Sequence, residues 1–249
     1  MEYPRRLPNI IKLKIKIMKT LGIIGGVGPD TTSKVYLSVI DLIRKNKKKY
    51  YPSIIIYNLP WPFVLENDMI IKGKNSKKMI PYLVSSARIL EKAGASFGIL
   101  PCNTLHKHIE QIRSSVKIPF LSILEETALK LKSLGVKNVG ILASQTTIKS
   151  NLYGKILSEN DIQTVYPKKV EQREINKIIV ELVRGKPGRF YTKKIQKICL
   201  SLSKRGAKNI LLACTDLQLA TSNIKSPVPV IDTMEILVQA TIRELIKDL

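Results

Sequence analysis

Short apolar runs alternate along the chain with longer amphipathic stretches. The runs are partly β-branched and bounded by Gly, Pro or Asn, which is typical of strands; they cover residues 20–26, 52–58, 96–101, 118–123, 137–143, 162–166, 208–213 and 228–231. Between them, residues 77–93 and 170–183 place apolar side chains at spacings of three and four, which indicates helices. This alternation predicts an α/β fold of parallel sheets covered by helices.

A weak internal repeat divides the chain into halves. LGIIGGVGPDTT at 21–32 is echoed by VGILASQTT at 139–147, and each half later ends a predicted strand on a cysteine. We therefore expect two similar doubly wound lobes related by a pseudo-twofold. Because ligands bind beyond the carboxyl ends of parallel strands, the active site is expected in the cleft between the lobes.

The expected lobe boundaries follow changes in sequence character. Near Lys117 the segment IRSSVKIPF changes pattern, and the C-terminal PVIDTMEILVQATIREL is expected to return to the first lobe as one strand and one helix. The expected first lobe comprises 18–117 and 228–249, and the second comprises 118–227. Residues 1–17 are expected to form an N-terminal extension without a functional role.

Composition narrows the class of protein. No apolar run among the 249 residues approaches the roughly 18 needed to span a membrane, and the charged N-terminal segment lacks a signal-peptide cleavage site, so we expect a cytoplasmic protein. Three cysteines without CxxC spacing favour neither a disulfide framework nor a zinc site.

The net charge of +23 raises the alternative of a nucleic-acid-binding module without catalysis. Such a module would gather basic residues on one face with accessible aromatic side chains, whereas the lysines here are scattered, with one dense cluster at 44–49. We therefore expect no nucleic-acid partner. The excess charge should still attract small anionic molecules.

Two cysteines occupy matching positions, Cys102 in GILPCNT and Cys214 in ILLACTD. Each follows a short apolar run and precedes small polar residues, as expected where a strand delivers a reactive group to a loop. Two thiols that face one carbon could remove and return its proton without a cofactor. Cys199 lies on an apolar helical face and is expected to belong to the core.

The residues after each cysteine could assist it. Asn103 or Thr104 could cap a following helix whose amino end favours a thiolate, and Thr215 could hydrogen-bond a substrate carboxylate. His106, four positions after Cys102, leaves open a Cys/His hydrolase or transferase, although that pairing ignores the second cysteine.

The glycine loop GIIGGVGPD follows the first predicted strand. Thr31 stands where GxGxxG requires its third glycine, so a dinucleotide site is not favoured. The loop is either a tight turn that lets backbone approach a carboxylate or a purely structural turn.

Several motifs in order resemble the cofactor-independent aspartate racemases of the aspartate/glutamate racemase family. They run from about Met18 to the C-terminus and comprise MKTLGIIGGVGPDTT, PCNTLH, IPFLSILEETA, GILASQTTIKSNLY, ACTDL and PVIDTMEILVQA. The resemblance implies two α/β lobes that each contribute one catalytic cysteine, Cys102 and Cys214. It also implies a homodimer, and it requires neither pyridoxal phosphate nor a metal.

The resemblance further implies a set of substrate-binding residues: Asn103, Thr104, Thr147, Arg184 and Thr215. In two places the sequence departs from the family pattern. Trp61, Phe63 and Val64 occupy the segment where archaeal aspartate racemases carry an arginine for the side-chain carboxylate, and Asp216 replaces the usual Glu.

The sequence therefore predicts a racemase of an acidic amino acid, most simply aspartate. The alternatives are a glutamate or broader-specificity amino-acid racemase, or a related isomerase or decarboxylase of small dicarboxylates.

Overall fold

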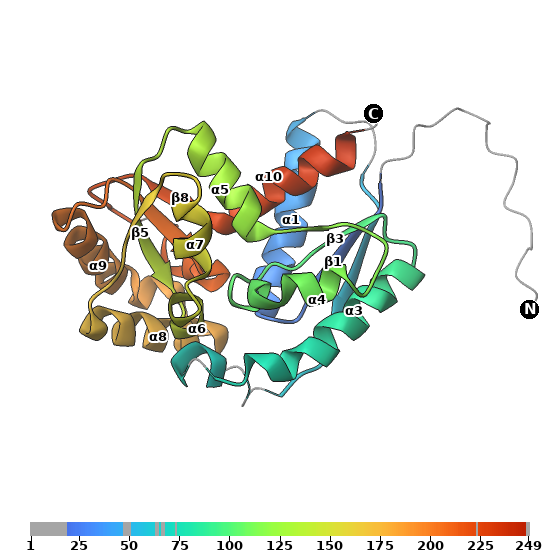
Figure 1. Cartoon of the computed structure of the whole chain (residues 1–249), viewed down its shortest axis with the longest axis horizontal. Coiled ribbons are helices and arrows are strands. Elements are labelled where there is room, and N and C mark those ends of the chain that lie inside the picture. Colours follow the sequence, from blue (N-terminus) through green and yellow to red (C-terminus); the bar gives the residue numbers. More distant parts are fainter. Residues whose placement is uncertain are drawn as a thin grey trace, which may run out of the picture.

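Two parallel four-stranded sheets form the framework of the molecule (Figure 1). The structure is a computed structural model that describes residues 19–46, 51–62, 65, 68–72, 74–222 and 224–247. The first sheet has the order β2-β1-β3-β4, from β1 (Leu21–Gly25), β2 (Ile54–Asn58), β3 (Phe97–Ile99) and β4 (Phe120–Leu121). The second has the order β6-β5-β7-β8, from β5 (Asn138–Ala143), β6 (Gln163–Val165), β7 (Ile210–Ala213) and β8 (Val230–Asp232). The matching orders confirm the predicted two-lobed α/β fold.

Helices cover both faces of each sheet and alternate with the strands along the chain. The α-helices are α1 (Pro29–Lys45), α3 (Ile80–Lys92), α4 (Ile109–Arg113), α5 (Ile123–Ser133), α6 (Gln145–Lys149), α7 (Leu152–Ser158), α8 (Lys169–Val183), α9 (Thr192–Lys204) and α10 (Thr233–Ile246). Shorter helical turns are η1 (Asp68–Lys72), η2 (Ser76–Met79), η3 (Thr104–His108), η4 (Gly188–Phe190) and η5 (Thr215–Ala220). None of the described helices is long and apolar enough to cross a membrane.

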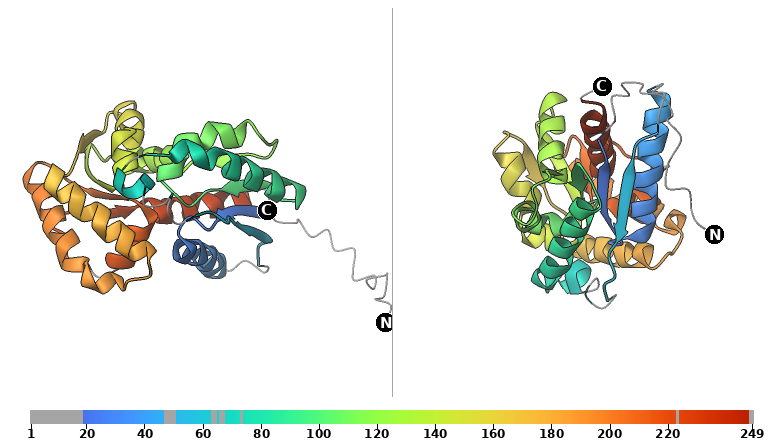
Figure 2. Two further views of the ribbon diagram at one scale, coloured as in Figure 1. Left: turned by 90° about the horizontal axis from the view of Figure 1, so that it is seen from below. Right: turned by 90° about the vertical axis from the view of Figure 1, so that its right-hand side faces the viewer.

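The apolar core lies in three clusters. One packs α3 and α4 against the first sheet, and one packs α8 and α9 against the second, with Cys199 buried in it as expected. The third joins the lobes, because side chains of β1, α1, α5, β5 and α10 contact one another. The red helix α10 leaves the second lobe and runs beside the blue α1 (Figures 1 and 2). The lobes are therefore held together by a shared apolar core.

Two strands belong to different lobes than the expected boundaries imply. β4 pairs with β3 (Gly98↔Phe120), so the first sheet continues beyond Lys117. β8 pairs with β7 (Leu212↔Asp232), so the C-terminal segment completes the second sheet, and only α10 packs against α1 of the first lobe. The change in sequence near Lys117 marks a connection within one lobe, since consecutive strands usually stay adjacent in one sheet. The proposed extension at 1–17 lies outside the described residues.

Gly98 in β3 shows why one strand position carries no side chain. A Cβ added there would lie 2.3 Å from the Cζ atom of Phe120, which fills the space above β3. This close packing aligns β4 beside β3 directly before the Cys102 loop.

Candidate active site

Cys102 and Cys214 line one cavity between the lobes. Cys102 follows β3 and Cys214 follows β7, so both lie beyond the carboxyl ends of central strands of their sheets. Cys214 is buried and Cys102 is partly buried. The structure thus brings the two thiols together, as the repeated sequence pattern predicts.

The wall of this cysteine pocket divides by chemistry. Its apolar members are Val27, Trp61, Met69 and Ile179. Its polar members besides the cysteines are Asn103, Thr104, Ser144, Thr215 and Asp216. The cavity volume is about 30 Å³, more than the roughly 10–15 Å³ that one water molecule requires in a cavity. The pocket is therefore narrow.

Three hydroxyl groups from both lobes meet at one side of the pocket. The Thr104 Oγ1 atom lies 2.8 Å from Ser144 Oγ and 3.2 Å from Thr147 Oγ1, and the last two are 3.1 Å apart. Ser144 is the N-cap of α6 and accepts from the Thr147 backbone N–H. Thr104 and Thr147 thus come together as expected. Sequence reasoning missed Ser144, although a serine between a strand and a helix is an N-cap signal.

Thr215 reaches the other lobe through a different contact. Its hydroxyl donates to the carbonyl oxygen of Pro101 at 3.2 Å. This bond joins the start of η5, directly after Cys214, to the loop that carries Cys102. It therefore sets the two cysteine loops relative to each other.

Asn103 is held by a buried network rather than serving as a helix cap. The Tyr153 hydroxyl on α7 donates to Asn103 Oδ1, and Asn103 Nδ2 donates to Thr233 Oγ1 at 3.1 Å. Thr233 in turn donates to the carbonyl oxygen of Leu212 at 2.8 Å. The expected capping contact is absent from the described loop, because the 3₁₀ turn η3 starts without a side-chain cap. Asn103 is therefore placed by residues of the second lobe.

Asp216 lies beside Cys214 and explains the glycine loop. Asp216 Oδ1 accepts from the Thr31 hydroxyl at 2.7 Å, and the Cys214 thiol points at Oδ2 with a separation of 3.8 Å. Gly28 has a φ of 78°, and a Cβ there would lie 2.7 Å from Asp216 Oδ1. The tight turn thus lets backbone approach a carboxylate of the protein itself.

Burial dominates the electrostatics at this end of the pocket. It raises the pKa of the Asp216 carboxyl, and the hydrogen bond from Thr31 opposes the shift only in part. The pKa of the Cys214 thiol is raised well above its ordinary value by burial and then by the neighbouring Asp216. Both effects favour the neutral thiol of Cys214.

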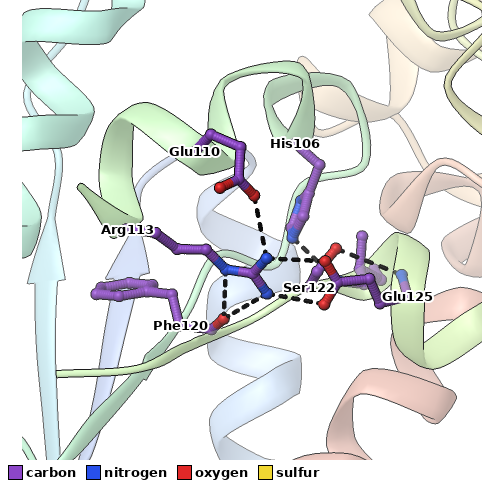
Figure 3. Close-up of polar contacts among 7 residues, drawn as sticks. His106, Glu110, Arg113, Phe120, Ser122 and Glu125 are labelled. Atoms are coloured by element: carbon purple, nitrogen blue, oxygen red, sulfur yellow. Dashed lines mark hydrogen bonds and ion pairs between the residues drawn. The ribbon is translucent and has the colours of Figure 1, made fainter.

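His106 is hydrogen-bonded to backbone groups rather than to Cys102 Sγ, and Figure 3 shows its ring beside Ser122 and Glu125. Its Nε2 accepts from the Ile123 N–H at 3.0 Å, so the ring proton is on Nδ1, which donates to the Cys102 carbonyl oxygen at 2.7 Å. Burial lowers its pKa to about 4. Both ring nitrogens are occupied, so the alternative Cys/His nucleophile is not supported.

An ion-pair network fixes the same region (Figure 3). Arg113 makes two 2.8 Å bonds to the carboxylate oxygens of Glu125 on α5 and donates to the Phe120 carbonyl oxygen at 3.0 and 3.1 Å. Ser122 caps α5 by accepting from the Glu125 N–H. The loop that carries Cys102 is thus supported from β4 and the start of α5.

Arg184 lies away from the cysteine pocket. It ends α8, pairs with Glu181 at 3.6 Å, and its side chain is 58% exposed. It lines a separate open cavity of about 670 Å³ and is not among the residues around the cysteines. Of the segment expected to replace the family arginine, Trp61 lines the pocket, and its Nε1 donates to the Gly26 carbonyl oxygen at 3.0 Å. Phe63 and Val64 lie outside the described residues.

Comparison with known proteins finds a family and relatives that share one kind of activity. Residues 24–241 match the family described as Asp/Glu/Hydantoin racemase. The chain is 33% identical to the broad specificity amino-acid racemase RacX of Bacillus subtilis over 89% of this chain and 96% of that protein. Among solved structures, an aspartate racemase homologue from Pyrococcus horikoshii has a TM-score of 0.74 at 30% identity, covering 91% and 98% of the two chains. The Picrophilus torridus aspartate racemase has a TM-score of 0.76 at 26% identity, covering 91% and 94%.

Proposed function

The chain belongs to the Asp/Glu/hydantoin racemase family, and on that premise we propose that it is an amino-acid racemase that exchanges the α-proton between Cys102 and Cys214. One observation carries the proposal. Thiols from equivalent strand ends of the two lobes line one small pocket. A pair of acid–base groups on opposite sides of a carbon is what inversion of its configuration requires.

The proposed step balances without a redox partner. One thiolate takes the α-proton as the Cα–H bond breaks, and the electron pair moves into the substrate carboxylate. The opposite thiol then gives its proton to the other face of Cα, so the two sulfurs exchange protonation states. Solvent or the reverse turnover restores them. The scheme needs no cofactor.

Stabilisation of the carbanion falls to donors already in place. The hydroxyl groups of Thr104 and Ser144 line the pocket and can donate to the developing charge on the substrate carboxylate. Thr215 also lines the pocket, but donation by its hydroxyl requires that it leave the Pro101 carbonyl oxygen. Thr147 hydrogen-bonds two members of this group and positions them. The carboxylate of Asp216 offers a partner for the substrate ammonium. Asn103, already bonded to Tyr153 and Thr233, acts mainly by positioning the Cys102 loop.

The predicted substrate, aspartate, has support from the resemblance and from the Picrophilus relative, whereas the Bacillus relative supports broader use of amino acids. Binding of Arg184 to a substrate carboxylate would require its side chain to leave Glu181 and enter the pocket. Assembly as a homodimer stays a prediction of the resemblance.

The test is exchange of the α-proton in deuterium oxide, followed by NMR for a panel of L-amino acids with Cys102→Ser, Cys214→Ser and the double variant. We expect exchange by the wild type and at least a 100-fold loss in the double variant and in the single variant that lacks the thiol acting as base on the L-enantiomer, in line with removal of a positioned base. Exchange that is equally fast in the double variant would refute the two-thiol mechanism. Turnover confined to unsaturated dicarboxylates such as maleate would support the isomerase alternative.

A further inference from the structure

The cysteine pocket holds no cationic side chain among its described lining residues. From this we infer that the enzyme acts on amino acids with neutral, mainly apolar side chains in preference to aspartate or glutamate, and that Trp61, Met69, Val27 and Ile179 select them. The inference rests on the proposed function and specifies its substrate class.

The lining groups can be assigned to the three substituents of Cα. The hydroxyls of Thr104 and Ser144 suit the α-carboxylate, and the Asp216 carboxylate suits the ammonium. The proposed proton exchange assigns Cys102 and Cys214 to the two faces of Cα. What remains for the side chain is an apolar wall, which gains from burial of hydrocarbon and offers no charge-assisted bond to a second carboxylate.

Four basic residues, Lys72, Lys177, Arg184 and Lys194, line the separate outer cavity and do not line the cysteine pocket. Lys72 pairs with Asp68 at 2.7 Å, and Lys194 pairs with Glu174 at 2.5 Å; both, like Arg184, line the open outer cavity. The sequence from Trp61 to Asp68, WPFVLEND, contains neither Lys nor Arg. An acidic side chain in the pocket would therefore lose its water without gaining a cation.

The wall is also fixed in place on three sides. Trp61 is held by its bond to the Gly26 carbonyl oxygen, and Ile179 is 1% exposed within α8. The backbone carbonyl oxygen of Met69 accepts from the Thr146 hydroxyl on the second lobe. Met69 itself, with a flexible unbranched side chain, can adapt to side chains of different length.

The decisive experiment measures kcat/KM for α-proton exchange with L-methionine, L-leucine, L-aspartate and L-glutamate. We expect the neutral substrates to exceed the acidic ones by at least tenfold. Equal or better turnover of aspartate would overturn the inference while leaving the two-thiol racemase intact. No exchange with any amino acid would instead refute the proposed function.

A second experiment introduces a positive charge into the apolar wall and compares it with a neutral control. Met69→Lys places an ammonium on a side chain of similar length, and Met69→Gln is the neutral control. We expect the ratio of aspartate to methionine kcat/KM to rise at least tenfold in the lysine variant and to change little in the glutamine variant. A ratio that rises equally in both, or in neither when circular dichroism shows that both variants fold, contradicts the assigned wall.

The variant Arg184→Met tests whether Arg184 enters the cysteine pocket during turnover. If aspartate is a good substrate and this variant lowers its kcat/KM without lowering that of methionine, Arg184 enters the pocket during turnover. That outcome would also overturn the inference.

Discussion

His106 and Asp232 are expected to make opposing contributions to the pH dependence of stability. His106 is buried with a pKa of about 4, below its ordinary 6.5, because burial disfavours the charged ring. Asp232, the N-cap of α10, has its carboxyl pKa raised by burial from 3.8 to about 6, although it accepts from the Met234 N–H at 2.8 Å. One group thus resists protonation in the fold and the other favours it.

The sign of each contribution follows from proton binding. Between about pH 6.5 and pH 4 the unfolded chain binds a proton at His106 that the fold does not, so the free energy of unfolding falls as the pH falls, by about 1.4 kcal/mol per pH unit. Between about pH 6 and pH 4 the fold binds a proton at Asp232 that the unfolded chain does not, so the free energy of unfolding rises by a similar amount per unit. In the wild type the two slopes largely cancel.

Single substitutions should expose each slope. We expect His106→Gln to gain about 1.4 kcal/mol per pH unit relative to the wild type as the pH falls below about 6.5, and Asp232→Asn to lose as much below about pH 6. Asn is also a good N-cap, so the second variant keeps the cap of α10.

Urea unfolding at a series of pH values from about 7.5 to about 4.5 measures these differences. Only the slopes of the free energy of unfolding against pH are compared, so a constant difference in stability between a variant and the wild type has no effect. Parallel curves for the wild type and His106→Gln would show that the histidine titrates normally. That result would refute the burial of a neutral imidazole at this position.

Three further variants test other contacts. Tyr153→Phe should lower the free energy of unfolding by about 1–3 kcal/mol and reduce kcat, because the buried Asn103 Oδ1 loses its donor; thermal unfolding and exchange kinetics measure both. Gly98→Ala should cost about 1–3 kcal/mol through the collision with the Phe120 ring, and an unchanged melting temperature would contradict the packing of β4. Asp216→Asn should speed alkylation of Cys214 near neutral pH, because the Asp216 carboxylate adds to the effect of burial in raising the pKa of that thiol. Mass spectrometry of alkylated peptides measures this rate. The same variant should lower kcat/KM.

Local patterns in the sequence were sufficient for the strands and for the cysteines. The strands β1 to β7 fall within the predicted apolar runs, and β8 extends one residue beyond the run at 228–231, to Asp232. The carboxyl ends of parallel strands bring Cys102 and Cys214 to one pocket. Sheet membership of β4 and β8 was less accessible, because pairing depends on contacts between segments distant in sequence.

The supporting residues of the site show the same limit. Ser144 carries a local N-cap signal that could have identified it. Tyr153 sits in a helix among apolar residues, where nothing nearby in the sequence distinguishes a hydrogen-bonding tyrosine from a core one. Arg184 matched a motif position, but its pairing with Glu181 one helical turn earlier directs it away from the cysteines.

The two thiols lie in unlike surroundings, and this constrains how the reaction can depend on pH. Cys214 is buried beside Asp216 and its thiol pKa is raised, whereas Cys102 is more exposed and its own backbone carbonyl oxygen accepts from His106 Nδ1. Enantiomers have equal free energies in water, so the kcat/KM values for the two directions must be equal at every pH. The asymmetry of the site can therefore appear only in kcat and KM separately. If Cys214 must be ionised to act on one enantiomer, the kcat and KM of that enantiomer should depend on pH differently from those of the opposite enantiomer. The kcat/KM values of the two enantiomers should nevertheless coincide at every pH.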